Sequence, residues 1–171
     1  LQAQVPQISE QPILSFKEAR HPLLIKNFGN VKKVIPFSLE LGEDFRIMII
    51  SGPNTGGKTV TLKTVGLLSL MALSGLPIPA EESSKIGIFH SIFADIGDNQ
   101  SLENSLSTFS SHLQNIGEMV ANGTSDSLVL IDELGSATDP EQGSALAQAI
   151  LERLTEINVL GIITTHYNSL K

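Results

Sequence analysis

The chain has 171 residues, long enough for one domain with its own core, and its hydrophobic content of 41% is that of an ordinary globular protein. Its net charge is −7 and its basic residues are scattered, the densest group being the pair Lys32–Lys33, which argues against a surface that grips nucleic acid through phosphates. No apolar run could span a bilayer, the amino terminus has no signal-peptide pattern and cysteine is absent, so we expect a cytoplasmic protein without a membrane partner, disulfides or thiolate metal sites.

The first part of the chain is predicted to be rich in strands. Residues 13–16 form an apolar strand, and in residues 37–41 apolar and polar side chains alternate, as in a half-exposed strand. Residues 42–44 then make a tight turn into a buried strand over residues 45–50. We expect the strands on either side of this turn to form a pair.

The segment Ser51–Thr59 reads Ser-Gly-Pro-Asn-Thr-Gly-Gly-Lys-Thr and joins that apolar strand to a helix predicted from Val60 to about Ser74. It fits the phosphate-binding pattern of a glycine, four residues, a glycine, a lysine and a serine or threonine, in the strand-to-helix context that the pattern needs. Glycines let backbone N–H groups surround an anion, and the helix points its positive end at the same place. The alternative is a glycine-rich turn that happens to precede a lysine. The nucleotide-binding residues predicted in this loop are Gly52, Pro53, Asn54, Thr55, Gly56, Gly57, Lys58 and Thr59, with Lys58 on the terminal phosphates and Thr59 on Mg²⁺.

The helix after the loop is apolar nearly all round, so we expect it inside the domain. Further along, residues 86–94 read as extended, and residues 127–131 and 159–165 as apolar strands. Helices are predicted from near Ser107 to about residue 122, and from Asp139–Pro140 onward, where aspartate can cap and proline suits the first turn. Strands that alternate with helices predict an α/β fold whose mostly parallel sheet is covered on both faces and binds ligands at the carboxyl ends of its strands.

We therefore predict a single nucleotide-binding domain over residues 1–171, with an antiparallel β part in residues 1–44 and a phosphate-loop core in residues 45–171. The chain starts at Leu1 rather than methionine and stops at Lys171, just past an apolar strand. We expect it to be a piece of a longer protein.

Two carboxylates, Asp132 and Glu133, follow the strand at 127–131. In a phosphate-loop protein the first lies beside Thr59 and holds Mg²⁺, usually through water, and the second orients or deprotonates a water near the γ-phosphate. Acidic pairs at exposed strand ends are common, so this interpretation depends on the phosphate-binding pattern upstream. His166 closes the last strand at the same sheet edge and can hydrogen-bond the γ-phosphate, the alternative being a surface histidine in a loop. His21 could also lie near the nucleotide.

Ser107 opens a helix whose first N–H groups and hydroxyl can contact phosphate, although a helix cap is the simpler interpretation. The guanine-selecting motif of asparagine, lysine, any residue and aspartate is absent after the two carboxylates. This absence favours ATP over GTP.

Five motifs occur in the order and spacing of the MutS ATPase domain, and the chain resembles that family over nearly its whole length from about Ile13. They are Arg20–Pro22, Gly52–Thr59, Ser107–Phe109, Asp132–Gly135 and Thr165–Tyr167. Four further segments resemble the second type of MutS protein, the paralogue that lacks the mismatch-reading domain. They are Thr55 with Thr59–Thr64, Gly75–Ala80, Phe93–Asp98 and Thr138–Pro140.

The resemblance implies a P-loop NTPase fold of the ATP-binding-cassette type that works as a homodimer, with each ATP held between two subunits. It implies that Ser107 acts across the interface, that His166 is the switch histidine and that Val34 and Ile35 lie against the adenine, while Asn54 contacts the phosphates. The family usually has glycine where this chain has Ala137, and if that position needs a positive φ, alanine costs about 1 kcal/mol there.

Full-length relatives of this type carry a core and clamp region before the ATPase domain and a small nuclease domain after it. The resemblance implies that they bind branched DNA such as recombination intermediates, and that some act on stalled ribosomes, through parts outside these residues. Two other functions stay open. A small-molecule kinase is disfavoured by the acidic pair Asp132–Glu133, which suits attack by water, and by the lack of an arginine-rich lid. A nucleotide-gated binding module without meaningful turnover is the second.

Overall fold

The computed structural model describes residues 3–52, 57–97, 105–136 and 139–167, with the backbone alone for 105–109. The described residues form helices and strands that alternate through most of the chain. In order they are β1 (Gln7–Ser9), β2 (Leu14–Ala19), α1 (Pro22–Phe28), a short 3-10 helix (Val31–Lys33), β3 (Phe37–Leu41), β4 (Ile47–Ser51), α2 (Lys58–Leu73), β5 (Lys85–Gly87), β6 (Ser91–Asp95), α3 (Ser105–Asn122), β7 (Ser127–Ile131), α4 (Pro140–Ile157) and β8 (Leu160–Thr165).

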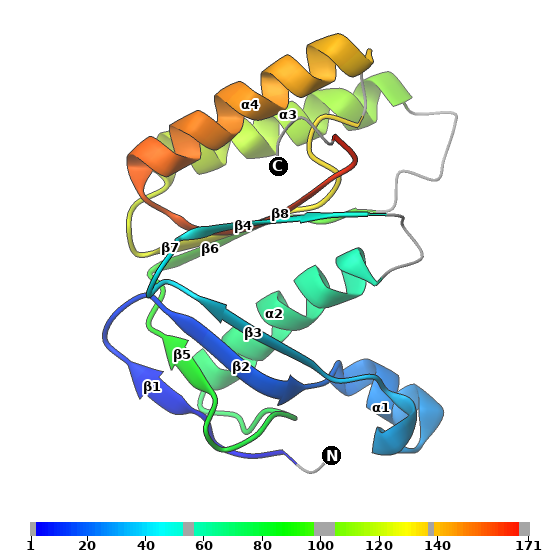
Figure 1. Cartoon of the computed structure of the whole chain (residues 1–171), viewed down its shortest axis with the longest axis vertical. Coiled ribbons are helices and arrows are strands. Elements are labelled where there is room, and N and C mark those ends of the chain that lie inside the picture. Colours follow the sequence, from blue (N-terminus) through cyan, green and yellow to red (C-terminus); the bar gives the residue numbers. More distant parts are fainter. Residues whose placement is uncertain (1–2, 53–56, 98–104, 137–138, 168–171) are drawn as a thin grey trace.

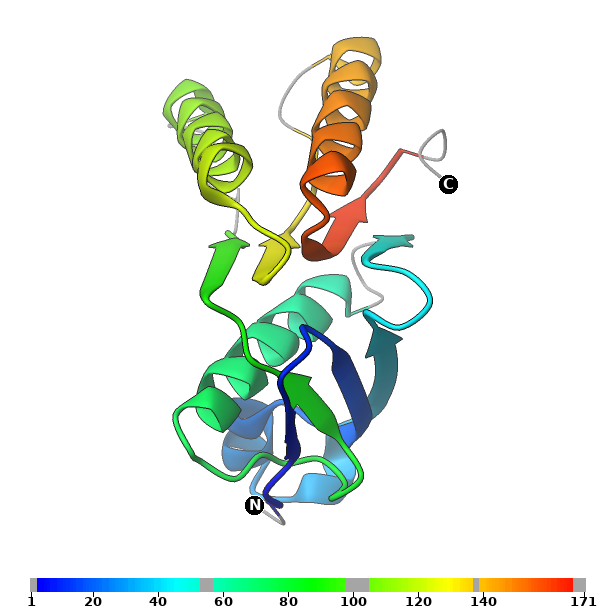
Figure 2. The same cartoon turned by 90° about the vertical axis from the view of Figure 1, so that its left-hand side faces the viewer.

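Two four-stranded sheets organise these elements. The first has the order β4-β8-β7-β6 and is parallel throughout, with α3 and α4 on one face and α2 on the other (Figure 1). The second has the order β1-β5-β2-β3, with β2 antiparallel to both of its neighbours, and it lies on the far side of α2 (Figure 2). The predicted α/β class, with a parallel sheet flanked by helices, is therefore confirmed.

The strand pair predicted around the turn at residues 42–44 is wrong. β3 pairs with β2, and β4 pairs with β8, so the turn leads from one sheet into the other. The buried strand predicted over residues 45–50 is shifted, because β4 begins at Ile47. It is also only half-buried, since β4 is an edge strand of its sheet, and Phe45, which precedes it, is 48% exposed. A turn with one hydrogen bond, from Gly42 N–H to the Phe45 carbonyl at 2.8 Å, allows the chain to change direction without forming a hairpin.

The extended stretch predicted over residues 86–94 also divides between the sheets. β5 joins β1 and β2, and β6 joins β7. The second sheet therefore combines strands from the first 44 residues with one strand that follows α2. Figure 2 shows this strand beside the amino-terminal strands.

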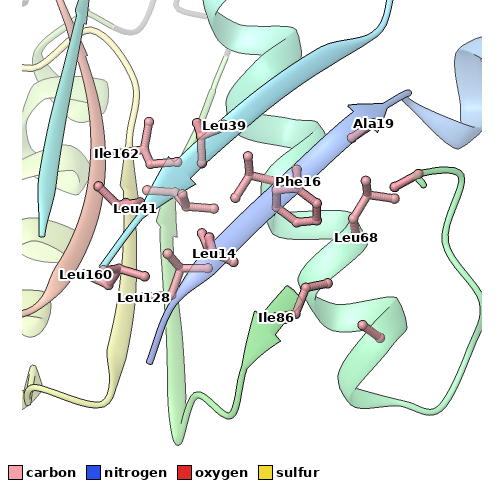
Figure 3. Close-up of a cluster of buried hydrophobic side chains, with 14 of the residues drawn as sticks. Leu14, Phe16, Ala19, Leu39, Leu41, Leu68, Ile86, Leu128, Leu160 and Ile162 are labelled. Atoms are coloured by element: carbon pink, nitrogen blue, oxygen red, sulfur yellow. The ribbon is translucent and has the colours of Figure 1, made fainter. Parts of the chain in front are cut away.

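α2 is packed between the two sheets, and its apolar side chains meet both. Leu62, Val65 and Leu68 are completely buried. Figure 3 shows Leu68 facing a cluster that includes Phe16 and Ile86. The composition of α2 predicted a helix that lies inside the domain on every side. The structure differs from this prediction, because Leu70 and Leu73 are 53% and 36% exposed. Two sheets cover two faces of a helix, and the third face remains at the surface.

The parallel sheet separates two cores. Leu128 and Leu130 of β7 face α2, whereas Val129 and Ile131 of the same strand face α3 and α4. This alternation buries β7 on both faces, as its continuous apolar sequence predicts. Within the residues that the structure describes, no helix has both the length and the apolar character needed to cross a membrane.

Candidate functional site

The carboxyl ends of the four parallel strands meet at one edge of the sheet. The register pairs Ser51 with Thr165 and Asp95 with Ile131, so the residues that end each strand lie in a row. The start of α2 lies at the same edge (Figure 1). In parallel α/β sheets this edge is where ligands bind.

At this edge a hydroxyl and a carboxylate predicted to hold Mg²⁺ lie side by side. Thr59 is the second residue of α2, and its Oγ1 donates a hydrogen bond of 2.6 Å to Oδ2 of Asp132. Asp132, one residue beyond β7, is 6% exposed, and its Oδ1 accepts a hydrogen bond from Oγ1 of Thr164. A buried carboxylate is costly unless it is hydrogen-bonded, and both oxygens of Asp132 have donors.

Lys58 begins α2, and its residue is 5% exposed. Its ammonium donates to the carbonyl oxygen of Gly52, the first glycine of the predicted phosphate loop. Gly57 caps the helix with φ 79°, a left-handed conformation that glycine adopts without strain. Pro53, Asn54, Thr55 and Gly56, which the sequence also predicts as nucleotide ligands, lie outside the described residues.

Glu133 continues the acidic pair with an unusual backbone, at φ 54°. Its N–H donates to Oγ1 of Thr164 at 2.8 Å, and its carboxylate Oε1 lies 3.6 Å from Nε2 of His166. The two side chains form an ion pair when the imidazole is protonated. The structure thus brings two predicted residues from different strand ends, β7 and β8, to neighbouring positions.

The loop after Glu133 is tied to the end of β8. The hydroxyl of Tyr167 donates to the carbonyl oxygen of Gly135 at 2.8 Å, and the hydroxyl of Thr165 donates to the carbonyl oxygen of Leu134 at 3.3 Å. Gly135 has φ 85° and packs against Gly143 of α4. Ala137, which would be unfavourable in this loop if its φ were positive, lies outside the described residues.

A groove of about 430 Å³ opens beside the start of α2. Val34 and Ile35, predicted to lie against an adenine, line it, the first buried and the second 89% exposed. His21 lines it too, and its Nδ1 is buried with no hydrogen-bond partner among the described residues. Burial, with a smaller effect of the Lys63 charge, lowers the pKa of His21 below its ordinary value, which favours the neutral imidazole.

The sequence did not predict a cluster that joins α3 to the sheet. Asp95 ends β6, is 5% exposed, contacts Nδ1 of His112 through Oδ2, and accepts a hydrogen bond of 2.9 Å from Asn115 through Oδ1. Its carbonyl oxygen accepts the N–H of Asp132 at 2.9 Å. His112 and Asn115 are three residues apart on α3, a spacing that could have revealed them as one helix face. A cavity of about 30 Å³, enough for a water, lies between this cluster and Glu133.

Ser107 belongs to the first turn of α3, and its side chain is outside the described atoms. Among the described residues no three His, Cys, Asp or Glu side chains gather in a way that would hold a metal ion. A Mg²⁺ ion bound to a nucleotide needs no such group, because it takes one or two protein oxygens and fills its octahedron with phosphate and water. The predicted ligands Thr59 and Asp132 fit this requirement.

Comparisons with known proteins agree with one another. Residues 48–171 match the family described as MutS domain V. The chain is 55% identical over 168 residues to a protein of Fusobacterium nucleatum named endonuclease MutS2, covering 98% of this chain and 21% of that protein. It is 54% identical over 171 residues to the protein of the same name from Alkaliphilus oremlandii, covering 100% of this chain and 21% of the relative. The chain thus spans about a fifth of the length of these relatives.

Proposed function

Because this chain belongs to the MutS family and is of the MutS2 type, we propose that it binds ATP with Mg²⁺ and hydrolyses it to ADP and phosphate, as a P-loop NTPase domain. The observation that carries the proposal is the hydrogen bond of 2.6 Å between the Thr59 hydroxyl and the Asp132 carboxylate. It joins the start of α2 to the carboxylate that follows β7, and β8 separates β7 from β4 in the sheet. A hydroxyl and a carboxylate in these two places hold Mg²⁺ in phosphate-loop enzymes.

In this proposal each residue of the site has a separate role. Thr59 and Asp132 hold Mg²⁺, which would neutralise charge on the β- and γ-phosphates. The ammonium of Lys58 exchanges the carbonyl oxygen of Gly52 for the terminal phosphates. Backbone N–H groups of the loop, from residues other than Pro53, and the positive end of α2 cradle the remaining phosphate oxygens.

Glu133 orients or deprotonates the attacking water, and His166 hydrogen-bonds the γ-phosphate. The support for this assignment is their separation of 3.6 Å at the edge of the sheet where α2 starts. The groove lined by His21, Val34 and Ile35 takes the adenine, since it is apolar in part and borders Gly57 at the end of the loop.

We further propose that the domain works as a homodimer in which Ser107 of each subunit contacts the ATP of the other. The relatives are named endonucleases, so DNA is the expected substrate of the longer proteins. Branched DNA, control of recombination and rescue of stalled ribosomes are proposals for those longer proteins, and they would use parts beyond this chain.

Lys58→Ala tests the central proposal. The substitution removes the ammonium expected on the terminal phosphates, so ATP binding should be abolished when titrated with a fluorescent ATP analogue in the presence of Mg²⁺. Lys85→Ala is a suitable control, because it removes an exposed lysine from β5 in the other sheet and should leave binding unchanged. Tight ATP binding by Lys58→Ala would refute the phosphate site.

A further inference from the structure

Thr164, the fifth residue of β8, makes hydrogen bonds with three consecutive residues that follow β7. Its hydroxyl donates to Oδ1 of Asp132 and accepts the N–H of Glu133 at 2.8 Å. Its carbonyl oxygen accepts the N–H of Leu134 at 2.9 Å. One buried threonine, 0% exposed, therefore contacts both members of the acidic pair.

The roles of the Thr164 hydroxyl follow from its chemistry. A hydroxyl has one proton and two acceptor positions. The amide of Glu133 can only donate, so the hydroxyl accepts there and its single proton is directed to the Asp132 carboxylate. The other oxygen of that carboxylate accepts from Thr59, so Asp132 is held from two sides, by α2 and by β8.

The contact with Glu133 acts on a strained backbone. Glu133 has φ 54°, a conformation that residues with a side chain adopt infrequently. The N–H groups of Glu133 and Leu134 donate to the hydroxyl and carbonyl oxygens of Thr164 in β8, and these two hydrogen bonds hold the chain in this bend. The bend directs the Glu133 carboxylate to within 3.6 Å of His166, two residues beyond Thr164.

The fold alone does not require a hydroxyl at this position. Ile162 and Ile163, which precede Thr164 in β8, are completely buried and apolar, and valine would have the same shape as threonine there. Burying a hydroxyl in such a strand is unfavourable unless it is hydrogen-bonded. Its partners are Asp132, proposed to hold Mg²⁺, and Glu133, proposed to act on the attacking water.

We propose that Thr164 is a positioning residue for ATP hydrolysis, in which one hydroxyl sets both the carboxylate that holds Mg²⁺ and the backbone that carries Glu133. The proposal rests on the proposed function of the preceding subsection. It assigns to Thr164 no contact with the nucleotide. Its effect passes through Asp132 to the Mg²⁺ dependence, and through Glu133 to the rate of turnover.

Three variants of the intact protein test this role. Thr164→Val keeps the shape and removes the hydroxyl, and Thr164→Ser keeps the hydroxyl and removes a methyl group. Ser127→Ala is the matched control, because Ser127 is also buried, its Oγ accepts the N–H of Thr124 at 3.0 Å, and it lies at the opposite end of the parallel strands. For each variant, kcat for phosphate release, the Mg²⁺ concentration at half-maximal rate and the urea midpoint are measured.

We expect Thr164→Val to lower kcat and to raise the half-saturating Mg²⁺ concentration, each by roughly ten- to a hundredfold, the range for losing a hydrogen bond to a charged group. Thr164→Ser should restore most of both. Ser127→Ala should lower the urea midpoint without changing kcat or the Mg²⁺ dependence. If Thr164→Val does not fold, Thr164→Ala replaces it in the comparison with Thr164→Ser.

Wild-type kcat and Mg²⁺ dependence in Thr164→Val would overturn the proposal. So would a Thr164→Ser variant as impaired as Thr164→Val, since the methyl group would then be the important part, or an equal loss of kcat in Ser127→Ala, since the effect would then follow stability. A wild-type protein without Mg²⁺-dependent ATP hydrolysis would overturn the proposed function itself, and this positioning role with it.

Discussion

Gly143→Ala should destabilise the protein, although alanine favours helices. A Cβ atom at Gly143 of α4 would lie 2.2 Å from the hydroxyl oxygen of Tyr167 and 2.4 Å from the carbonyl oxygen of Gly135. Alanine gains about 1 kcal/mol of helix propensity over glycine. Displacing Tyr167 loses its hydrogen bond to Gly135, worth about 1 kcal/mol, and overpacking against a backbone oxygen costs about 1–3 kcal/mol more. The net expectation is a loss of about 1–3 kcal/mol.

The same exchange at Gly117 provides the control. Gly117 lies within α3, and an added Cβ would have no atom within 4 Å other than those of its own helix and chain neighbours. Gly117→Ala should therefore gain about 0.5–1 kcal/mol. Urea unfolding of both variants measures the free energies. A Gly143→Ala protein as stable as the wild type or more so would show that Tyr167 and residues 133–136 move aside freely, and would refute the tight packing inferred at this loop.

Glu133→Gln keeps the size of the side chain and removes its charge, so ATP should still bind while phosphate release slows by about a hundredfold, and unchanged turnover would instead favour a binding module. Mixing Lys58→Ala with Ser107→Ala protein should recover hydrolysis, because mixed dimers contain one intact composite site, whereas no recovery at any ratio would assign Ser107 to a helix cap. The folded state lowers the pKa of His21 from its ordinary 6.5, so the unfolded chain binds more protons just below pH 6.5 and stability should fall as the pH decreases through that value. His21→Asn should flatten this part of the dependence of unfolding free energy on pH, and an unaltered slope would contradict the burial of His21.

Several features of the fold followed from local sequence signals. The aspartate and proline at 139–140 predicted the start of α4, and Asp139 accepts hydrogen bonds from the N–H groups of Glu141 and Gln142 in the structure. The continuous apolar run 127–131 predicted β7 with the observed bounds. Such signals act between residues within one turn or one strand, so they can be recognised without the rest of the chain.

The pairing of strands could not be recognised in this way. The alternation in β3 indicates one buried face, and it is the same whether the partner is β2 or β4. For this reason the predicted pair around residues 42–44 was wrong, and the stretch at 86–94 was not divided between two sheets. Which strands meet depends on how α2 is packed between the sheets, and this is a property of the whole chain.

The candidate site shows the same division. The pattern of residues 51–59 and the carboxylates Asp132 and Glu133 predicted, from sequence alone, which polar groups lie at the carboxyl-end edge of a parallel sheet, because each motif is a short segment with its own chemistry. Only the tertiary structure decided that Thr164 joins Asp132 to Glu133 and that His112 binds Asp95. Those contacts link residues 17 to 32 positions apart, and the register of β7 against β8 and the placement of α3 bring them together.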